Sequence, residues 1–452
     1  MSDGGRTLTG GFPLRILTLS EPGGRLVTAW LAGQPIGEDE AERNLARRLL
    51  DAGLADPDPS PGARSTKEVT VVVPVYADAD RLANALAPIA ADATVIVVDD
   101  GSPSLTDTTV AAVAHKHGAR YLRLPENRGA STARNAGMRL ATTPLVAFLD
   151  ADCVPPPCFP EGLVDHLADP AVALVAPRVV ASTRQEGPIA AYERHRSALD
   201  MGPCPSPIRP YSPVWYVPSA AMVARRDALA SGFDEDLSLG EDVDLVWRLH
   251  DAGWDLRYDP RITVAHETRA QPIAWYRRKI AYNESVAPLL RRHPERLPVV
   301  FLTPRAGLAW AAALAGSPGP LLALAGTRAA QFRRSFRGRL PDATARGARA
   351  GAEMTLHEGR DLARAVGGPW APFAVALAVV GPRKLSRRLG ALVAAMAVGD
   401  WIADRPDLDP VRYSALRLAD ESSRGLGIWL GCLHERDFRG LLPRRPPPPD
   451  QR

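Results

Sequence analysis

The sequence predicts an α/β protein built on a doubly wound, mainly parallel sheet, with a small module before the sheet and a helical region after it. Between residues 67 and 270, short apolar segments alternate with helical patterns, as they do where helices connect parallel strands. These segments are apolar almost throughout, which is typical of strands buried on both faces. Ligands of such sheets bind beyond the carboxyl ends of the strands. The segments that predict strands are residues 69–75, 94–98, 120–124, 145–149, 172–176 and 262–265.

Composition limits the class of protein. The chain has 452 residues, 46% of them hydrophobic, so two or three domains with full cores are expected. A net charge of only +4 does not indicate a nucleic-acid partner, and we expect none. The four cysteines match neither a zinc site nor a disulfide framework, which favours a reducing, cytoplasmic setting. The first residues, MSDGGRTLTGG, lack the apolar stretch of a secretory signal.

The N-terminal region, residues 1–55, is predicted to be a small module of its own. A β-like run at 12–19 precedes helical patterns at 24–31 and 38–52, and the second pattern has leucines at helical spacing. Residues 56–66 are rich in Pro, Asp and Ser and are predicted to form a linker. We therefore expect the sheet domain to start after a separate folded unit.

The C-terminal region, residues 271–440, is apolar and arginine-rich by turns. Residues 306–327 carry no charge, and as one helix they would be about 33 Å long, against roughly 30 Å of bilayer hydrocarbon. Ser-Pro-Gly-Pro at 317–320 is expected to break that helix. Shorter apolar runs flank a basic stretch at 383–388. We expect interfacial helices or one kinked span at the cytoplasmic side of a membrane, with a buried helical bundle as the alternative, and a disordered tail at 441–452.

Polar motifs follow the first two predicted strands. The first strand ends near Pro74 and leads into Tyr76, whose ring could stack on a nucleobase. The second leads into Asp99 and Asp100, whose carboxylates could accept hydrogen bonds from a base or a ribose. Each motif also has a structural interpretation, with Pro and Tyr as ordinary strand-end residues and an aspartate as the cap of the next turn.

An arginine-containing motif, ENRGASTARNAGMRLA, begins at Glu126. Gly129 lets the backbone bend, and a helix is expected to start near Ser131. Arg128 and Arg134 could reach a diphosphate, and the N-terminus of the helix would add its dipole. The alternative for either arginine is an exposed, solvated side chain.

Two carboxylates follow the fourth predicted strand. Asp150 and Asp152 are two residues apart in an extended segment, so both side chains can face one cation. Mg²⁺ or Mn²⁺ prefers oxygen ligands and often bridges carboxylates to the phosphates of a substrate. His266, after the last predicted strand, could add an imidazole nitrogen, although a lone histidine at a strand end is usually structural. We therefore predict a metal site formed by Asp150, Asp152 and His266.

A further acidic pair, Glu241 and Asp242, opens a helical pattern in which Val243, Val246 and Leu249 recur. One of the two carboxylates could take a proton from an acceptor hydroxyl as a general base. The alternative is a first-turn acidic pair that complements the helix dipole.

Together these motifs resemble family 2 glycosyltransferases of the GT-A fold. The resemblance implies an inverting transfer of a sugar from a nucleotide diphosphate donor, with a divalent metal. The processive Q-x-x-R-W motif is not matched, because the segment from Gln271 to Trp275 lacks the arginine, although Arg277 and Arg278 could substitute. The matching residues are PVY at 74–76, VDDGS at 98–102, NRGASTARN at 127–135, DAD at 150–152 and GED at 240–242.

Two other enzyme classes are disfavoured. A nucleotidyltransferase would have a glycine-rich phosphate loop after Tyr76, and the segment there is not one. A dehydrogenase would have G-x-G-x-x-G after the first strand, and none follows it.

The resemblance also implies roles for single residues. The nucleoside site is lined by Pro74, Tyr76, Asp99 and Asp100. Asp150 contacts the ribose or the metal, and Asp152 holds the metal. Asp242 is the general base, with Glu241 beside it.

The flanks are similar to a narrower group, the mycofactocin-system glycosyltransferases. The stretch RRKIAYNESVAPLLRRHP at 277–294 looks like the same stretch in that group, with Asn283 where a glycine is expected. The N-terminal module resembles a trimmed winged-helix, peptide-recognition module. The resemblance implies transfer of a hexose, glucose in particular, from a donor of the UDP-glucose type to a peptide-derived redox cofactor. The alternatives are a cell-wall polysaccharide or lipid acceptor, and a membrane-bound peptide-binding scaffold with a vestigial transferase domain.

Overall fold

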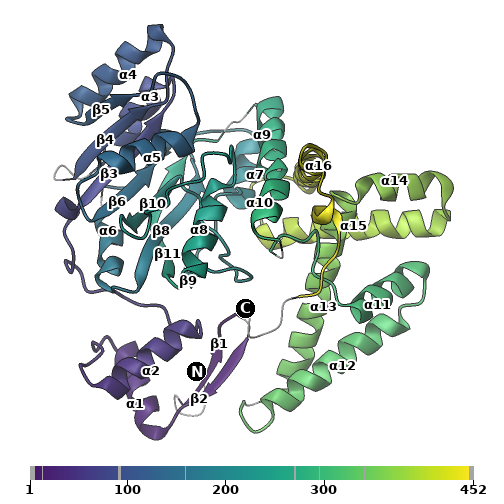
Figure 1. Cartoon of the computed structure of the whole chain (residues 1–452). Helices are drawn as coiled ribbons and strands as arrows, with labels where there is room; N and C mark the ends of the chain where they lie inside the picture. Colours follow the sequence, from purple (N-terminus) through teal and green to yellow (C-terminus); the bar gives the residue numbers. More distant parts are fainter. Residues whose placement is uncertain are drawn as a thin grey trace. The chain divides into compact units, whose positions relative to one another are not determined.

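The chain divides into two compact units (Figure 1). The first, which we call the sheet unit, consists of residues 56–292 and 406–408. The second, which we call the helical unit, consists of residues 1–55, 293–405 and 409–452. The computed structural model describes residues 6–12, 14–89, 93–157, 159–268, 271–294, 296–340 and 342–446.

The elements of the sheet unit form where apolar runs and turn residues alternate in the sequence. Each predicted strand is present; two have the predicted bounds, one is a residue shorter, and three extend beyond the predicted ends. The strands are β3 (Val69–Val75), β4 (Thr94–Asp99), β5 (Arg120–Arg123), β6 (Leu145–Leu149), β7 (Cys153–Val154), β8 (Val172–Ala181), β9 (Ser206–Pro207), β10 (Ala221–Arg225) and β11 (Asp255–His266). The helices are α3 (Ala79–Leu86), α4 (Ser104–Lys116), α5 (Ala130–Leu140), α6 (Glu161–Val164), α7 (Pro188–Arg196), α8 (Glu241–Asp251), α9 (Pro272–Glu284) and α10 (Val286–Arg292).

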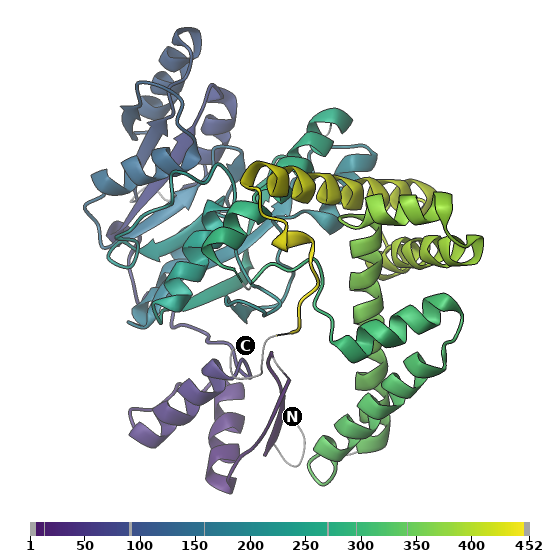
Figure 2. The same ribbon diagram turned by 45° about the vertical axis from the view of Figure 1, so that its right-hand side comes forward.

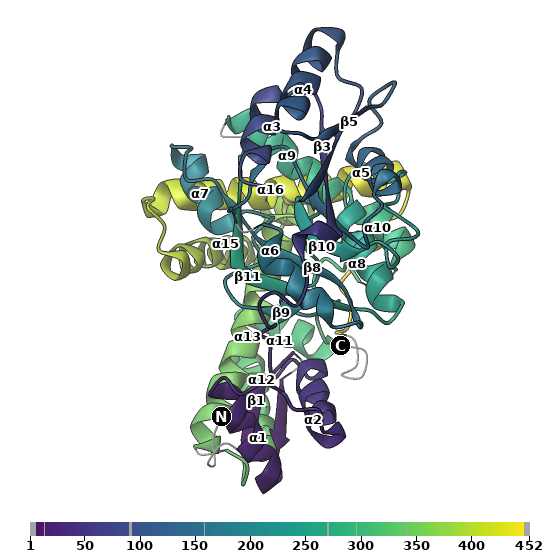
Figure 3. The ribbon, with the colours of Figure 1, turned by 90° about the vertical axis from the view of Figure 1, so that its left-hand side faces the viewer.

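Among the described residues, nine strands form one sheet in the order β5-β4-β3-β6-β10-β8-β11-β7, with β9 beside β11 (Figures 1 and 3). Strands β5, β4, β3 and β6 are parallel, as are β8 and β11. β10 runs antiparallel between β6 and β8, and β7 and β9 run antiparallel to β11. The prediction of a GT-A-like sheet with parallel strands is confirmed, and the antiparallel strands β7, β9 and β10 make the sheet mixed. The βαβ rhythm missed β10 because a Pro- and Ser-rich segment precedes it instead of a crossover helix.

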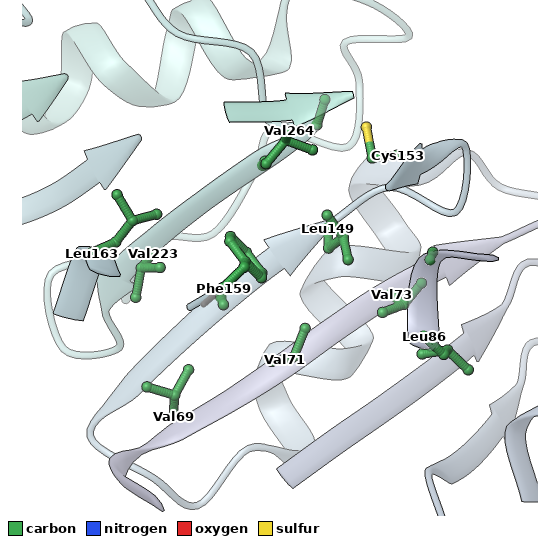
Figure 4. Close-up of a cluster of buried hydrophobic side chains, with 14 of the residues drawn as sticks. Val69, Val71, Val73, Leu86, Leu149, Cys153, Phe159, Leu163, Val223 and Val264 are labelled. Carbon is green, nitrogen blue, oxygen red and sulfur yellow. The ribbon is translucent and has the colours of Figure 1, made fainter. Parts of the chain in front are cut away.

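Successive residues of β3 reach opposite faces of the sheet, as the pleat requires. Val69, Val71 and Val73 belong to a buried cluster with residues of α3, α4 and α6 (Figure 4). Val72 points to the other face, against α5. There an added Cβ on Gly137 would lie 2.3 Å from Val72 Cγ1, so glycine is what lets α5 pack this closely on β3.

Two segments that we expected outside the sheet domain belong to the sheet unit. In the predicted linker, the Arg64 N–H donates to the Asp165 carboxylate at 2.8 Å. α9 lies after the predicted boundary at residue 270, and Glu193 of α7 holds it. The Glu193 carboxylate accepts from the indole N–H of Trp275 at 2.8 Å and pairs with the ammonium of Lys279 at 2.9 Å.

The N-terminal module contains a hairpin and two helices. β1 (Thr7–Gly10) pairs antiparallel with β2 (Arg15–Thr18), and α1 (Glu21–Leu31) and α2 (Glu40–Asp51) follow. The side chains of Ser20 and Asp39 accept hydrogen bonds from the first turns of the two helices. Leu8, Leu19, Val27 and Leu49 form a small buried cluster. The helices match the predicted ones, and the winged-helix identity of the module stays a prediction.

The C-terminal part of the helical unit is built from helices. The predicted break in the long apolar run is confirmed, because α11 ends at Ala315 and Gly316 adopts a left-handed conformation with φ of 111°. No single helix of the described residues is long and apolar enough to cross a membrane, while α13 and α14 together reach that length and composition with a bend of 77° between them. The helices are α11 (Pro304–Ala315), α12 (Gly319–Phe336), α13 (Ala343–Gly367), α14 (Ala371–Val380), α15 (Arg383–Asp404) and α16 (Pro410–Glu435).

Buried charges join α13, α15 and α16. Arg417 of α16 is 4% exposed and pairs with Asp400 of α15 and with Glu421, both at 2.7 Å. Arg364 of α13 also pairs with Glu421 at 2.9 Å, and Arg360 of α13 pairs with Asp400. Burial opposes ionisation of Glu421, but the surrounding arginines outweigh it and lower its pKa to about 2.

Part of the tail predicted to be disordered is described by the structure. The Leu302 N–H donates to the Arg444 carbonyl, and the Trp370 indole donates to the Leu441 carbonyl, both at 2.8 Å. Residues 447–452 lie outside the described residues.

Candidate active site

The two aspartates at the end of β4 bind the loops that follow the strand. The Asp99 carboxylate is fully buried and accepts hydrogen bonds from the backbone and hydroxyl of Ser102 and, at 2.6 Å, from the hydroxyl of Tyr121. The Asp100 carboxylate accepts from the N–H groups of Arg128 and Gly129 at 2.9 and 2.8 Å. Burial raises the pKa of Asp100, although these hydrogen bonds oppose the rise. Both side chains are therefore engaged by the protein, as the structural interpretation of this motif expects.

The end of β3 presents one exposed ring. Pro74 is buried within the strand, and Tyr76 just beyond it is 50% exposed. Tyr76 is thus free to stack on a flat ligand, and its role in base binding stays a prediction. Arg128 is also exposed, and its guanidinium lies 3.7 Å from the Glu235 carboxylate.

Arg134 of α5 takes a place that the sequence did not indicate. We expected its guanidinium to be exposed or to reach a diphosphate, but it is only 2% exposed. It donates to Asp150 at 2.6 Å and to Glu241 at 2.9 Å, and it lies over the ring of Phe233 at 5.4 Å. Burial alone would lower the pKa of Arg134. The charges of Asp150 and Glu241 have the larger effect and raise it above its ordinary value, so the guanidinium stays charged. Arg134 therefore links the DAD turn to the start of α8 and does not project toward a ligand.

The second carboxylate of the DAD turn meets the predicted histidine. β7 pairs with the end of β11, so that Cys153 lies opposite His266. This pairing brings His266 Nε2 to 3.4 Å from Asp152 Oδ2. Burial opposes ionisation of Asp152, but His266 and the charges of Arg81 and Arg278 outweigh it and lower the pKa of Asp152. The Asp152 carboxylate is thus ionised over the physiological range.

The donor set of this pair fits a divalent cation only in part. Among the described residues, no group of three or more His, Cys, Asp or Glu side chains is placed to hold a metal ion. Asp150, the third expected ligand, has one carboxylate oxygen bound to Arg134. A carboxylate with an imidazole is nevertheless a suitable partial set for Mg²⁺ or Mn²⁺, because these cations usually take further ligands from water and from substrate phosphates.

The acidic pair stands at the start of α8, as predicted. Gly240 precedes it with φ of 86°, and an added Cβ there would lie 2.9 Å from Leu289 Cδ1, which favours glycine at this turn. Glu241 binds Arg134 and lies 3.3 Å from the Ser219 hydroxyl. Asp242 accepts from its neighbour's N–H at 2.8 Å and from the Ser219 N–H at 3.4 Å.

The environment of Asp242 alters its acidity. Burial raises the pKa of Asp242, and the adjacent Glu241 carboxylate adds to the rise, so that the pKa is about 7. A carboxyl group with a pKa near the working pH can both take up and release a proton. The first-turn position alone does not explain this shift, because a helix dipole favours the ionised form.

A pocket of the sheet unit adjoins the Asp152–His266 pair and is lined by two side chains of α9: Arg278, which the sequence named only as a substitute in the processive motif, and Tyr282, which it did not single out. Arg278 of α9 lies over the ring of Tyr282 at 4.6 Å. Burial raises the pKa of Tyr282, and the charges of both Asp152 and Asp242 add to the rise, so both carboxylates lie within electrostatic reach of this ring. The four-residue spacing of Arg278 and Tyr282 on one helix was the available signal. The pocket is lined by Arg81, Asp152, Glu193, Ser197, Ala198, Leu199, His266, Glu267, Thr268, Trp275, Arg278, Lys279 and Tyr282.

Several known proteins are similar to this chain. Among solved structures, the chain is similar to a mannosyltransferase from Pyrobaculum calidifontis in complex with GDP-Man and Mn²⁺, with a TM-score of 0.42 and 19% identity over 84% of this chain and 97% of that one. The chain is also 28% identical over 280 residues to a validoxylamine A glucosyltransferase of Streptomyces hygroscopicus. That alignment covers 53% of this chain and 65% of that protein.

A relative over nearly the whole chain shows the family, and a family model agrees with it. The family model described as "Glycosyl transferase family 2" matches residues 70–231. The chain is also 38% identical over 457 residues to a pre-mycofactocin glycosyltransferase of Mycobacterium tuberculosis, an alignment that covers 97% of this chain and 94% of that protein. With its motifs in the expected order on a GT-A-like sheet, the chain belongs to glycosyltransferase family 2 and, within it, to the family of pre-mycofactocin glycosyltransferases.

Proposed function

We propose that this glycosyltransferase moves a hexose, glucose in particular, from a nucleotide diphosphate donor of the UDP-glucose type to a hydroxyl of a mycofactocin precursor, with inversion at the anomeric carbon. The acceptor part rests on the similarity to the tuberculosis protein over nearly the whole chain. The observation that carries the reaction type is the pair of carboxylates, Asp152 and Asp242, within reach of the same Tyr282 and with pKa values moved in opposite directions. The lowered pKa keeps Asp152 ionised, as a cation ligand must be, and a pKa near 7 lets Asp242 take up and release a proton.

Asp242 is the general base of the proposed reaction. In its ionised form it accepts the proton of the acceptor hydroxyl, and the oxygen attacks the anomeric carbon from the face opposite the diphosphate. The raised pKa makes the carboxylate a stronger base than an ordinary aspartate. Ser219 and the backbone of α8 orient it through two N–H groups.

The leaving diphosphate needs positive charge. Asp152 and His266 are the residues that would hold a Mg²⁺ or Mn²⁺ ion, which when bound supplies Lewis-acid neutralisation of the diphosphate. Arg278 is the protein cation that we assign to the same task, because it lines the pocket and interacts with the charges of Asp152 and Asp150. It joins Arg128, whose role at the diphosphate stays a prediction, and takes the place of Arg134, whose guanidinium is enclosed.

The proposal is tested with purified protein and a panel of UDP- and GDP-linked sugars, with and without Mg²⁺ or Mn²⁺. The acceptors are a mycofactocin precursor, an isoprenoid lipid and an oligosaccharide. We expect metal-dependent release of UDP from UDP-glucose, a gain of one hexose mass on the precursor, and a β-linkage by NMR from the α-linked donor. Transfer only to the lipid or the oligosaccharide would overturn the acceptor assignment, and an α-linked product would overturn inversion.

A further inference from the structure

Helices α14 and α15 form a hairpin (Figures 1 and 2). Its first helix, α14, is apolar and exposed. All ten residues of α14 are apolar, and none of them is buried. Near its end, Val379 and Val380 are 79% and 85% exposed, and Phe373 is 58% exposed. A contiguous apolar patch of this kind on a protein surface marks an interaction site.

The tip of the same hairpin is basic. A Gly-Pro turn follows α14, and α15 then begins with Arg383 and Lys384, with Arg387 one turn further on. All three side chains are exposed, and among the described residues none of them has a carboxylate partner. The sequence from 362 to 399 contains no aspartate or glutamate. The tip therefore combines exposed apolar side chains with uncompensated positive charge.

Buried ion pairs and a hydrogen bond hold the base of the hairpin, where α14 begins and α15 ends. Asp400 of α15 is 1% exposed and pairs with Arg417 of α16 at 2.7 Å and with Arg360 of α13. Trp370, just before α14, is held by its indole hydrogen bond to the Leu441 carbonyl. Charged side chains thus lie in the interior of this bundle while apolar ones point outward, which is the distribution expected beside an apolar phase.

We propose that the tip of this hairpin binds the surface of an anionic lipid bilayer, with Val379 and Val380 inserted among the lipids and Arg383, Lys384 and Arg387 on the headgroups. α14 is about 15 Å long, half the thickness of the hydrocarbon core, so it lies in the interface and does not span it. Apolar insertion together with cation–headgroup attraction is the combination that holds peripheral proteins on membranes. The cytoplasmic leaflet supplies the anionic lipids that such a surface needs.

Charge decides between a lipid surface and a second copy of the chain. A symmetric dimer through this tip would bring the same three cations of each copy together, and no aspartate or glutamate between residues 362 and 399 is present to offset them. An anionic bilayer instead neutralises them. We therefore commit to the lipid surface as the partner, and this assignment does not depend on which sugar or acceptor the enzyme uses.

The test is sedimentation of the full-length protein with phosphatidylcholine vesicles that contain either no or 30% phosphatidylglycerol, a mixture chosen as roughly the charge of an anionic membrane. We expect binding to the anionic vesicles that weakens with added salt. Replacing the three cations (Arg383→Gln, Lys384→Gln, Arg387→Gln) should lower the partition coefficient on the order of 100-fold, at about five-fold per charge. Val379→Ser with Val380→Ser should lower it by roughly ten-fold or more.

Matched control variants distinguish binding by this tip from nonspecific binding by any exposed cations. The exposed cations Arg333, Arg334 and Arg337 of the α12 end carry the same charge, and their replacement by Gln should leave vesicle binding within about three-fold of wild type. Each variant should keep glycosyl transfer to a soluble acceptor, which verifies its fold. Three outcomes would overturn the proposal. The wild-type protein fails to bind anionic vesicles, the control variants lose as much binding as the tip variants, or the valine variants change only the oligomeric state.

Discussion

The clearest test of the active-site assignment is the replacement Asp242→Asn. With a pKa of about 7, the Asp242 carboxyl is about one-tenth ionised at pH 6 and about nine-tenths ionised at pH 8. If its carboxylate is the base, kcat/KM of the wild-type enzyme should rise about ten-fold between these pH values and then level off. The Asn variant should lose ~100- to 10,000-fold of the activity at pH 8 and should no longer show this rise.

The assay is the release of nucleoside diphosphate at saturating metal between pH 5.5 and 9. Asp251→Asn, the same chemical change in the last turn of the same helix, is the control and should leave the profile unchanged. An Asn variant within three-fold of wild type, or a wild-type profile that is flat between pH 6 and 8, would refute the assignment of Asp242 as the base.

Stability provides an independent check on the same group. The pKa of Asp242 is higher in the folded protein than its ordinary value of 3.8, so the folded state binds the proton more tightly than the unfolded chain does. Stability is therefore lost as the pH rises from about 4 through 7. The Asn variant should have a higher Tm than wild type at pH 8 and an equal Tm at pH 4. An equal Tm at both pH values would contradict the raised pKa.

Four further replacements test other contacts. Asp152→Ala should abolish metal-dependent donor binding in titration calorimetry, and unchanged binding would remove Asp152 from the metal site. Arg134→Met leaves two buried carboxylates without their cation, so urea unfolding should show a loss of about 3–5 kcal/mol, and a loss below 1 kcal/mol would contradict the bridge. The pKa of Glu421 is about 2 in the folded protein, against an ordinary 4.5, so its ionised form contributes about 3 kcal/mol to the free energy of unfolding above pH 4.5. This contribution is lost as the pH falls toward 2. Glu421→Gln should therefore remove this pH dependence from acid unfolding followed by circular dichroism. Gly137→Ala should destabilise by about 1–3 kcal/mol through its contact with Val72, whereas Gly390→Ala, which meets open space, should not, and equal effects would contradict the close packing of α5.

Much of the site could be predicted because polar residues that follow buried parallel strands collect at one edge of the sheet. β3, β4 and β6 are adjacent and parallel, so the positions of Tyr76, Asp100 and Asp152 at their ends follow from the strand pattern. The first-turn position of Asp242 followed from the helical spacing of α8. These are local patterns, and a local pattern is what a single sequence reveals.

Contacts between distant segments could not be predicted in the same way. The place of Arg134 depends on α8 arriving beside α5, and nothing near residue 134 distinguishes an arginine that faces a ligand from one that is enclosed. The antiparallel β10 was missed for a related reason. A Pro- and Ser-rich segment precedes its five residues, and no crossover helix leads into them.

The bridge that Arg134 forms has a consequence for protein engineering. One guanidinium pairs with carboxylates of two segments that lie far apart in the chain, the DAD turn and the start of α8, so these segments cannot be exchanged singly between related transferases. A chimera that imports a new turn around Asp150 without a matching α5 and α8 leaves a charge stranded in the interior. Attempts to change the donor of this enzyme should therefore transplant the three segments as one cassette.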